Sequence, residues 1–200
     1  YSKSIMRYIK DKFFIERKNI RSLTKKFNTP LYCYSYKNLR GNIENFKKAF
    51  KEIRPLICFS VKSNSNISLL KEIKKLGLGA DVVSKGELYA SLKAGIDKNK
   101  IVFSGVGKTK DEIEYAIKQK ILLINSESLS EVLEIEKVAK KFNKVVDIGL
   151  RLNPDTDAET LKQISTGKSE NKFGVDKKTF VKIISLMKQS KFINIKCLSV

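Results

Sequence analysis

The chain has 200 residues, of which 42% are hydrophobic and 9% aromatic, so it is long and apolar enough to bury a sizeable core. Only three prolines are present, which argues against a disordered or linker-rich chain. The formal net charge of +20 comes mainly from lysines spread along the whole sequence, and this dispersed pattern with few arginines disfavours a nucleic-acid-binding protein.

Other protein classes are excluded by what the sequence lacks. No stretch approaches the roughly 20 consecutive apolar residues that cross a bilayer, and residues 8–20 mix charges with apolar residues, unlike a signal peptide. We therefore expect a cytoplasmic protein without membrane contact. Cys33, Cys58 and Cys197 lie far apart and are predicted to be buried free thiols. Without histidines or close cysteine pairs, no metal site is expected.

The hydrophobic pattern predicts alternating strands and helices after a distinct N-terminal piece of about 28 residues. Short β-branched runs predict strands at 30–34, 56–61, 80–83, 101–104, 121–125, 145–152 and 193–200. Helical spacing predicts helices at 37–51, 68–76, 84–95, 110–119, 129–142 and 177–188. The one long irregular stretch, 153–174, is polar, and loops of that length in compact domains are usually functional.

This βα alternation indicates an α/β fold with a parallel sheet, as in a (β/α)8 barrel of the TIM type. Such a barrel typically needs ~250 residues. If the strand at 56–61 is barrel strand one, the chain reaches strand six at its last residues. We therefore expect an incomplete barrel, with residues 29–200 truncated before closure.

Lys62 is the first candidate for chemistry. It ends the apolar run 56–61 and is followed at once by Ser63-Asn64-Ser65-Asn66. A buried strand that delivers one amine into a polar loop suits a Schiff-base lysine, because partial desolvation makes the amine nucleophilic. The carboxyl end of a barrel strand is also where catalytic residues lie.

Six motifs occur in one order along the chain. They are Thr29-Pro30-Leu31-Tyr32, Val61-Lys62-Ser63-Asn64-Ser65-Asn66, Gly79-Ala80-Asp81-Val82-Val83-Ser84-Lys85-Gly86-Glu87-Leu88, Phe103-Ser104-Gly105-Val106-Gly107-Lys108-Thr109, Arg151-Leu152-Asn153-Pro154-Asp155, and Ser165-Thr166-Gly167 with Asn171-Lys172-Phe173-Gly174. In this order they resemble the diaminopimelate decarboxylases, a branch of the barrel-type (fold type III) pyridoxal-phosphate decarboxylases. The resemblance runs from about residue 27 to the last residue.

The resemblance implies a cofactor and a reaction. Lys62 occupies the position that binds pyridoxal 5'-phosphate as an internal aldimine, and the cofactor ring would store the charge left by decarboxylation. The expected reaction is meso-diaminopimelate to L-lysine with release of CO2, in lysine biosynthesis. Asp81 and Arg151 would line the cofactor side of the barrel and neutralise one another there. A purely structural ion pair at the barrel mouth is the alternative for these two residues.

Three further features have local explanations. The spacing of Glu87 after Ser84 is that of a helix cap, and Lys172 reads as an exposed basic loop residue. Gly105 and Gly107 resemble a phosphate-cradling turn, although tight strand-to-helix turns need glycine for backbone reasons alone.

The resemblance also implies what this chain lacks. A ring-stacking histidine, a phosphate loop, a Glu-Pro-Gly-Arg segment and a C-terminal β-domain are expected beyond residue 200, and residues 1–28 would contribute to that β-domain. The fragment itself is expected to be inactive, and the complete enzyme to be a homodimer with shared active sites. The alternatives are an ornithine, arginine or carboxynorspermidine-type decarboxylase of the same fold, and a non-catalytic pyridoxal-phosphate-binding protein.

Overall fold

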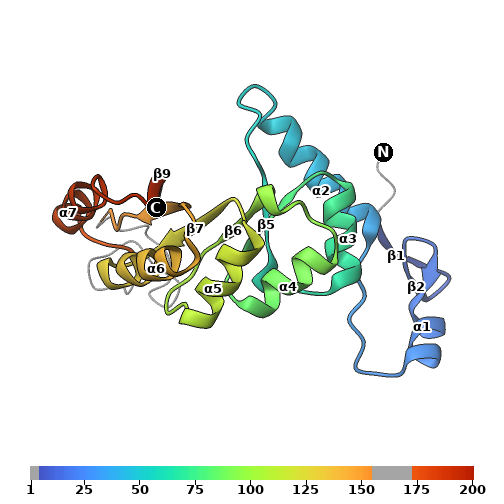
Figure 1. Cartoon of the computed structure of the whole chain (residues 1–200). Helices are drawn as coiled ribbons and strands as arrows, with labels where there is room; N and C mark the ends of the chain where they lie inside the picture. The colour runs from blue at the N-terminus through green and yellow to red at the C-terminus, as the bar shows by residue number, and fades with distance from the viewer. Residues whose placement is uncertain (1–4, 155–172) are drawn as a thin grey trace. The chain divides into compact units, whose positions relative to one another are not determined.

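The computed structural model describes residues 5–154 and 173–200 (Figure 1). Asp155, the Ser165-Thr166-Gly167 motif and Lys172 therefore lie outside the described residues. By its internal contacts the chain divides into two compact units, Tyr1–Pro55 and Leu56–Val200. The predicted division into residues 1–28 and 29–200 stays a prediction.

The N-terminal unit contains a small antiparallel sheet and two helices. Strands β1 (Met6–Ile9) and β2 (Lys12–Ile15) form a hairpin, and β3 (Lys18–Asn19) pairs with the other edge of β2. Helix α1 (Ile20–Phe27) follows directly, because the Asn19 side chain caps it by accepting a hydrogen bond from the Arg21 N–H at 2.9 Å. Helix α2 (Tyr36–Ala49) completes the unit and matches the helix predicted at 37–51. Helix α1 was not predicted.

The strand predicted at 30–34 is wrong. Residues 31–35 form an irregular segment with no ladder partner among the described residues. Its aromatic side chains, which suggested a half-buried strand, are exposed, and Tyr32 keeps 84% of its surface accessible. Pro30 has no N–H to donate to a sheet, so it could not have anchored a strand there.

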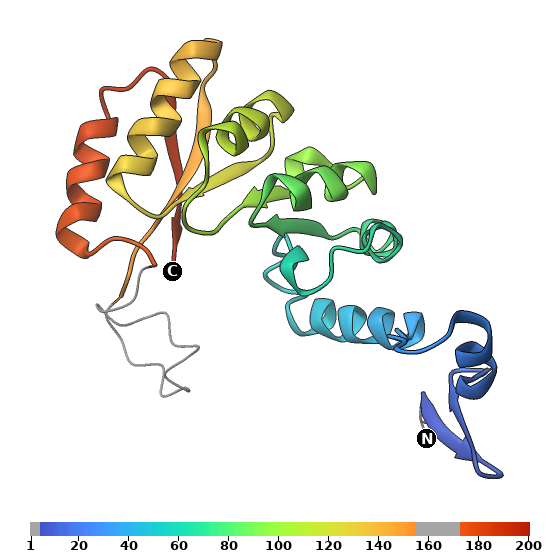
Figure 2. The same cartoon turned by 90° about the horizontal axis from the view of Figure 1, so that it is seen from below.

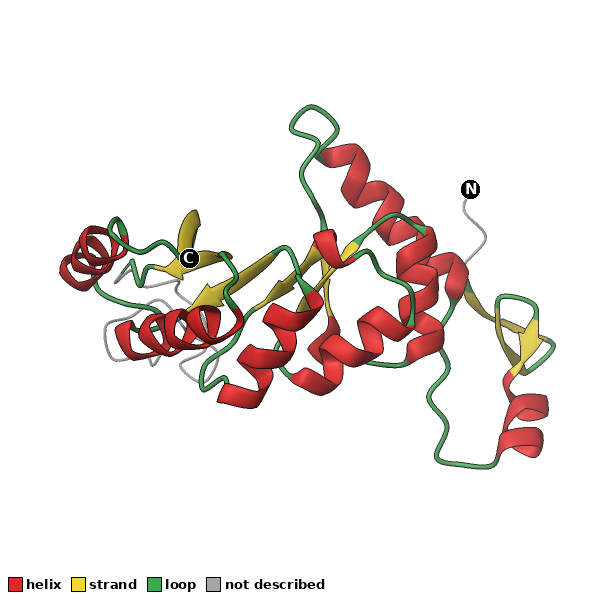
Figure 3. Cartoon of the chain, in the orientation of Figure 1, coloured by secondary structure: helices red, strands yellow, loops and turns green. Residues whose placement is uncertain are grey.

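The second unit is a six-stranded parallel sheet whose strands alternate with helices, and it confirms the predicted incomplete (β/α)8 barrel with strands one to six (Figures 1 and 3). The sheet order is β4-β5-β6-β7-β8-β9, and every neighbouring pair is parallel. The strands are β4 (Cys58–Ser60), β5 (Gly79–Val82), β6 (Ile101–Phe103), β7 (Leu123–Ser126), β8 (Val146–Arg151) and β9 (Ile193–Ser199). The helices are α3 (Ile67–Lys75), α4 (Lys85–Lys93), α5 (Lys110–Gln119), α6 (Leu129–Phe142) and α7 (Lys177–Met187).

The core of this unit lies between the sheet and its helices. Figure 2 shows α4, α5, α6 and α7 along one side of the curved sheet. Alternate strand residues point into that layer and are fully buried, as for Ile101 and Phe103 on β6 and Ile148 and Leu150 on β8. The residues between them point to the opposite face. At the carboxyl ends of the strands, that face carries polar side chains.

The remaining sequence predictions concern cysteines, membranes and metals. The three cysteines are free thiols, but each is half-buried rather than buried. No helix in the described part of the chain is long and apolar enough to cross a membrane. Within residues 5–154 and 173–200, no cluster of three or more acidic or cysteine side chains is arranged to hold a metal ion.

Candidate active site

Lys62 lies in a single 3-10 turn, Val61–Ser63, immediately after β4. Val61 is fully buried and anchors the turn, which is closed by hydrogen bonds from the Ser63 hydroxyl to the Ser60 carbonyl at 2.7 Å and from the Asn64 N–H to the Val61 carbonyl at 2.9 Å. Asn66 then caps α3. The local sequence therefore fixes the backbone of Lys62 on both sides.

The Lys62 side chain itself is exposed, so the partial desolvation predicted for its amine is not present in the described part of the chain. Its ammonium has no hydrogen-bond or ion-pair partner among the described residues. An amine that is free of such partners at the end of a barrel strand is accessible to a small carbonyl compound.

Polar side chains from the neighbouring strands form a hydrogen-bonded chain. Because strand residues alternate between faces, Asp81 on β5 and Asn125 on β7 point away from the helices, on the same face as Ser104, which follows β6. The Asn125 amide donates to the Ser104 hydroxyl at 3.0 Å, and that hydroxyl donates to Asp81 Oδ1 at 2.6 Å. Ser104 therefore orients the Asp81 carboxylate.

A cavity of about 520 Å³ brings the three predicted site residues together. Lys62, Asp81 and Arg151 all line it. The other lining residues are Val83, Ser104, Gly105, Val106, Phe173, Ser199 and Val200. Its volume lies within the range of small-molecule sites, roughly 300–1,000 Å³.

Arg151 does not pair with Asp81, so that part of the prediction is wrong. Its Nη1 donates to Glu127 Oε1 at 3.2 Å, and its guanidinium lies over the Phe173 ring with 5.1 Å to the centroid. The sheet order explains the difference, because Glu127 follows β7, the neighbour of β8, whereas β5 is three strands away. Sequence reasoning missed Glu127 altogether.

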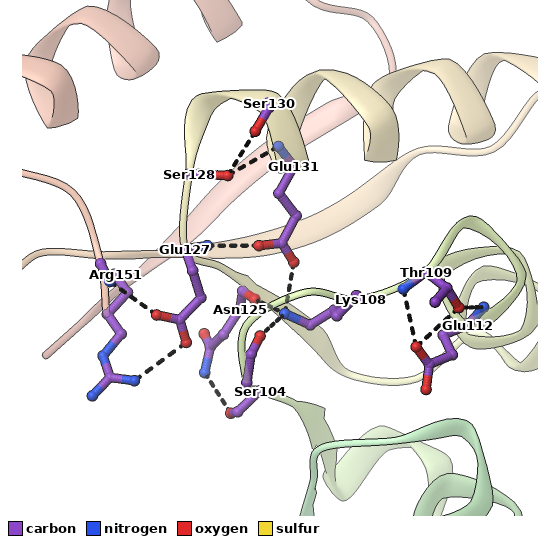
Figure 4. A network of polar contacts seen from close by, with 12 residues as sticks. Ser104, Lys108, Thr109, Glu112, Asn125, Glu127, Ser128, Ser130, Glu131 and Arg151 are labelled. Carbon is purple, nitrogen blue, oxygen red and sulfur yellow. Dashed lines mark hydrogen bonds and ion pairs between the residues drawn. The ribbon is translucent and has the colours of Figure 1, made fainter. Parts of the chain in front are cut away.

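Lys108 and Glu131 form a buried ion pair that the sequence did not lead us to expect (Figure 4). Lys108 is only 1% exposed, and its ammonium donates to Glu131 Oε1, the Gly105 carbonyl and the Asn125 carbonyl, each at 2.6 Å. The other oxygen of Glu131 accepts the Glu127 N–H at 2.9 Å. Lys108 therefore ties the turn after β6 to the end of β7 and the start of α6.

The glycine turn after β6 has a backbone explanation. Gly105 and Gly107 have φ values of +91° and +72°, a region that side chains rarely adopt. The Gly105 carbonyl accepts a hydrogen bond from the Lys108 ammonium. A Cβ added at position 105 would lie 3.2 Å from the Cβ of Val83.

Glu87 acts as a helix cap, in agreement with its spacing. The Ser84 hydroxyl accepts the Glu87 N–H at 3.2 Å, while the Glu87 carboxylate accepts the Val83 N–H at 2.9 Å. The same Ser/Thr-x-x-Glu spelling recurs at Thr109 with Glu112 and at Ser128 with Glu131. That repeat is the sequence signal that could have led to Glu131.

Two ionisable groups near the sheet have shifted pKa values. Burial, and then the negative charge of Asp81, raise the pKa of the Cys58 thiol to about 11. Burial also acts to raise the pKa of Glu112, but hydrogen bonds from Thr109 and from the Lys85 N–H outweigh it and lower the net pKa. Cys58 is therefore a neutral thiol and Glu112 a charged cap at neutral pH.

Comparison with known proteins gives one family. Residues 36–200 match the family described as "Pyridoxal-dependent decarboxylase, pyridoxal binding domain". The chain is 45% identical over 175 residues to the diaminopimelate decarboxylase of Helicobacter pylori strain J99, covering 88% of this chain and 43% of that protein. It is also 45% identical over 162 residues to the diaminopimelate decarboxylase of Neisseria meningitidis strain Z2491, covering 81% of this chain and 40% of that protein. The chain thus spans less than half the length of these curated relatives.

Solved structures agree with the sequence comparison. The crystal structure of diaminopimelate decarboxylase from M. jannaschii superposes with a TM-score of 0.89 at 33% identity, over 96% of this chain and 46% of that one. The Helicobacter pylori enzyme complexed with L-lysine superposes with a TM-score of 0.87 at 42% identity, over 90% of this chain and 46% of that one. An arginine decarboxylase of Paramecium bursaria Chlorella virus shares the fold, with a TM-score of 0.66 at 20% identity over 89% of this chain and 46% of that one.

Proposed function

We infer from the family to which this chain belongs, the pyridoxal-dependent decarboxylases, that the protein carrying it removes a carboxyl group from an amino acid with the help of pyridoxal 5'-phosphate. We propose meso-diaminopimelate as the substrate and L-lysine and CO2 as the products. The observation that carries the proposal is the Lys62 amine, which has no polar partner among residues 5–154 and 173–200 and lies at the cavity that Asp81 and Arg151 also line. The 45% identity to diaminopimelate decarboxylases supports the choice of substrate.

The residues present fit the cofactor. An aldehyde needs a nucleophilic amine, which Lys62 supplies. Anionic oxygens need a cation, and the Arg151 guanidinium, whose side chain is 22% exposed, lies at the cavity wall. A polar group of the bound molecule can donate to Asp81, whose Oδ1 is already held by Ser104. Lys62, Asp81 and Arg151 are therefore the residues proposed to hold the cofactor.

When bound, pyridoxal phosphate supplies an electron sink for the charge that decarboxylation leaves on the substrate. The residues of this chain supply position and electrostatics. Lys62 would hold the cofactor through its amine, and Arg151 would favour an anionic oxygen of the bound molecule, because both residues line the cavity. Ser104 and Asn125 keep the Asp81 carboxylate in one orientation through the chain of hydrogen bonds.

Diaminopimelate is favoured over arginine or ornithine by the degree of similarity. The two curated relatives and two solved structures described above, all named diaminopimelate decarboxylase, are 33–45% identical to this chain, although another solved diaminopimelate decarboxylase is only 21% identical. The arginine decarboxylase and a lysine/ornithine decarboxylase from Vibrio vulnificus are 20% and 17% identical, so they support the fold alone.

We further propose that the complete protein is a cytoplasmic homodimer with shared active sites and that residues 1–28 belong to a β-domain. Sedimentation of the complete protein at several concentrations tests the dimer. The 200-residue chain on its own should show little turnover, because it spans less than half of its relatives.

The test of the proposed function uses the complete protein and its Lys62→Ala variant. Wild-type protein titrated with pyridoxal phosphate should develop the visible absorbance band of lysine-bound cofactor, and Lys62→Ala should not. The matched control is Lys71→Ala, which removes an exposed lysine on α3. CO2 release is then measured with meso-diaminopimelate, ornithine and arginine. No band in the wild type refutes the cofactor assignment, whereas a band with turnover of another amino acid refutes the substrate.

A further inference from the structure

Among the described residues, the Glu127 carboxylate accepts a hydrogen bond from the Arg151 guanidinium, and the Phe173 ring lies against it (Figure 4). Arg151 is the last residue of β8, and its side chain is 22% exposed at the cavity wall. The side chain of Glu127 is only 4% exposed. The carboxylate therefore lies in the protein interior, while the guanidinium faces the cavity.

Glu127 is itself fixed from several sides. Its Oε1 accepts from Arg151, and its Oε2 accepts the Gly174 N–H at 3.0 Å. Its own N–H donates to Glu131 Oε2 at 2.9 Å, and Glu131 is paired with the buried Lys108 at 2.6 Å. Both carboxylate oxygens and the N–H of Glu127 therefore have hydrogen-bond partners, so its side chain has little freedom to turn away from Arg151.

The charges of this network balance. Lys108 and Arg151 are cations, and Glu127 and Glu131 are anions, in an environment where the side chains of Lys108, Glu127 and Glu131 are at most 9% exposed. Burying such charges is costly, and hydrophobic replacements of similar volume are often at least as stable. Stability alone therefore does not account for a carboxylate at position 127.

The backbone of Arg151 is also held by close contacts with residues 174 and 175. The Val175 N–H donates to the Arg151 carbonyl at 2.9 Å, and Gly174 packs so closely that an added Cβ would lie 2.9 Å from that carbonyl oxygen. Phe173 lies against the guanidinium. The three residues 173–175 and Glu127 thus confine Arg151 to one position.

We propose that Glu127 is a positioning residue that orients the Arg151 guanidinium toward an anionic oxygen of the molecule bound in the cavity. This inference rests on the proposed function, since it takes that molecule to be pyridoxal phosphate or its amino-acid adduct. Glu127 acts through Arg151 and does not contact the bound molecule. The 1% exposed Lys108 and its partner Glu131 hold the Glu127 backbone in place.

The experiment compares Glu127→Gln, Arg151→Lys and the double variant in the complete protein. Glutamine keeps the size of the side chain but loses its charge and one acceptor. For each protein, the dissociation constant of pyridoxal phosphate is measured by absorbance titration, and kcat and KM are measured with meso-diaminopimelate. Glu114→Gln is the matched control, because that carboxylate is also mostly buried but pairs with surface lysines Lys118 and Lys141. Glu127→Asp, which keeps the charge and shortens the side chain, serves if Glu127→Gln does not fold.

We expect Glu127→Gln to weaken cofactor binding or kcat/KM by roughly tenfold to a hundredfold, the size seen when partners that orient metal ligands are removed. Glu114→Gln should leave both unchanged. On the Arg151→Lys background, the Glu127 substitution should cost less than about threefold, because the residue it orients has already been changed.

Three outcomes separate the possibilities. If Glu127→Gln changes the cofactor dissociation constant and kcat/KM no more than Glu114→Gln does, the inference is overturned. It is also overturned if the fold-changes of Glu127→Gln and Arg151→Lys multiply in the double variant, because Glu127 would then act independently of Arg151. If instead the unmodified protein binds no cofactor, the proposed function fails, and the role of Glu127 that rests on it fails with it.

Discussion

Replacing Lys108 by methionine should strongly destabilise the chain. The substitution keeps most of the side-chain volume but removes an ammonium that donates three hydrogen bonds of 2.6 Å while 1% exposed. It leaves the Glu131 carboxylate, 9% exposed, without its cation, and the carbonyls of Gly105 and Asn125 without that donor. Removing one partner of a buried pair costs about 3–5 kcal/mol. For a chain of this size that is a fall of about 6–20 °C in Tm.

The assay is urea unfolding followed by far-UV circular dichroism, with the free energy of unfolding extrapolated to water. Lys85→Met is the matched control, because Lys85 makes an ion pair of the same 2.6 Å with Asp111, but their side chains are 45% and 73% exposed. That variant should lose less than about 1 kcal/mol. Adding Glu131→Gln to Lys108→Met removes the unpaired charge and keeps an acceptor for the Glu127 N–H, so it should recover about 1 kcal/mol or more. Equal losses for Lys108→Met and Lys85→Met would refute the reasoning.

Two other predictions concern the sheet. Gly149→Ala should cost about 1–3 kcal/mol, because Gly149 is buried and its Cβ would lie 2.1 Å from Asn125 Oδ1. Gly41→Ala in α2, where an added Cβ meets no atom within 4 Å, should instead stabilise the chain by about 0.5–1 kcal/mol, so urea midpoints of the two variants that move in the same direction would contradict this. The pKa of Cys58, raised to about 11 by burial and by Asp81, predicts that iodoacetamide at pH 8 labels Cys58 more slowly than the other two cysteines, since roughly one thiol in a thousand is then ionised. Equal labelling rates of the three cysteines, measured by peptide mass spectrometry, would oppose this assignment. Because the folded state favours the neutral thiol, Cys58 leaves the free energy of unfolding unchanged below its ordinary pKa of 9.0 and lowers it as the pH rises from 9 toward 11.

The parts of the fold with strong local signals were predictable. The helices expected at 110–119 and 129–142 agree with α5 and α6 at both ends, because Thr109 and Ser128 cap their first turns and left-handed residues Lys120 and Asn143 end them. The six barrel strands were located by their short β-branched runs. The resemblance to the decarboxylases also implied that Asp81 and Arg151 line the cofactor side of the barrel, and both residues line the cavity.

Where prediction failed, the deciding contact was remote in sequence or the local signal was absent. Helix α1 lies in a segment that looked like part of a β-domain, and only the cap from Asn19 begins it. The exposed aromatic residues after Pro30 imitate a half-buried strand, but no described strand offers a ladder partner. A hydrophobic pattern therefore predicts burial correctly only where another strand or helix packs against the apolar residues.

The partner of Arg151 shows the same limit at the site. The resemblance places Asp81 and Arg151 on the cofactor side of the barrel, but the expected ion pair takes no account of the strands that separate them. Strands β5 and β8 are three positions apart in the sheet, and three spacings of about 4.8 Å put their backbones about 14 Å apart along it, beyond the reach of a direct ion pair. The adjacent strand β7 ends beside β8, so the carboxylate that meets Arg151 had to come from the residue just after β7. Sheet order therefore selects Glu127 as the partner of Arg151 and leaves Asp81 to accept a hydrogen bond from Ser104, just after the neighbouring strand β6.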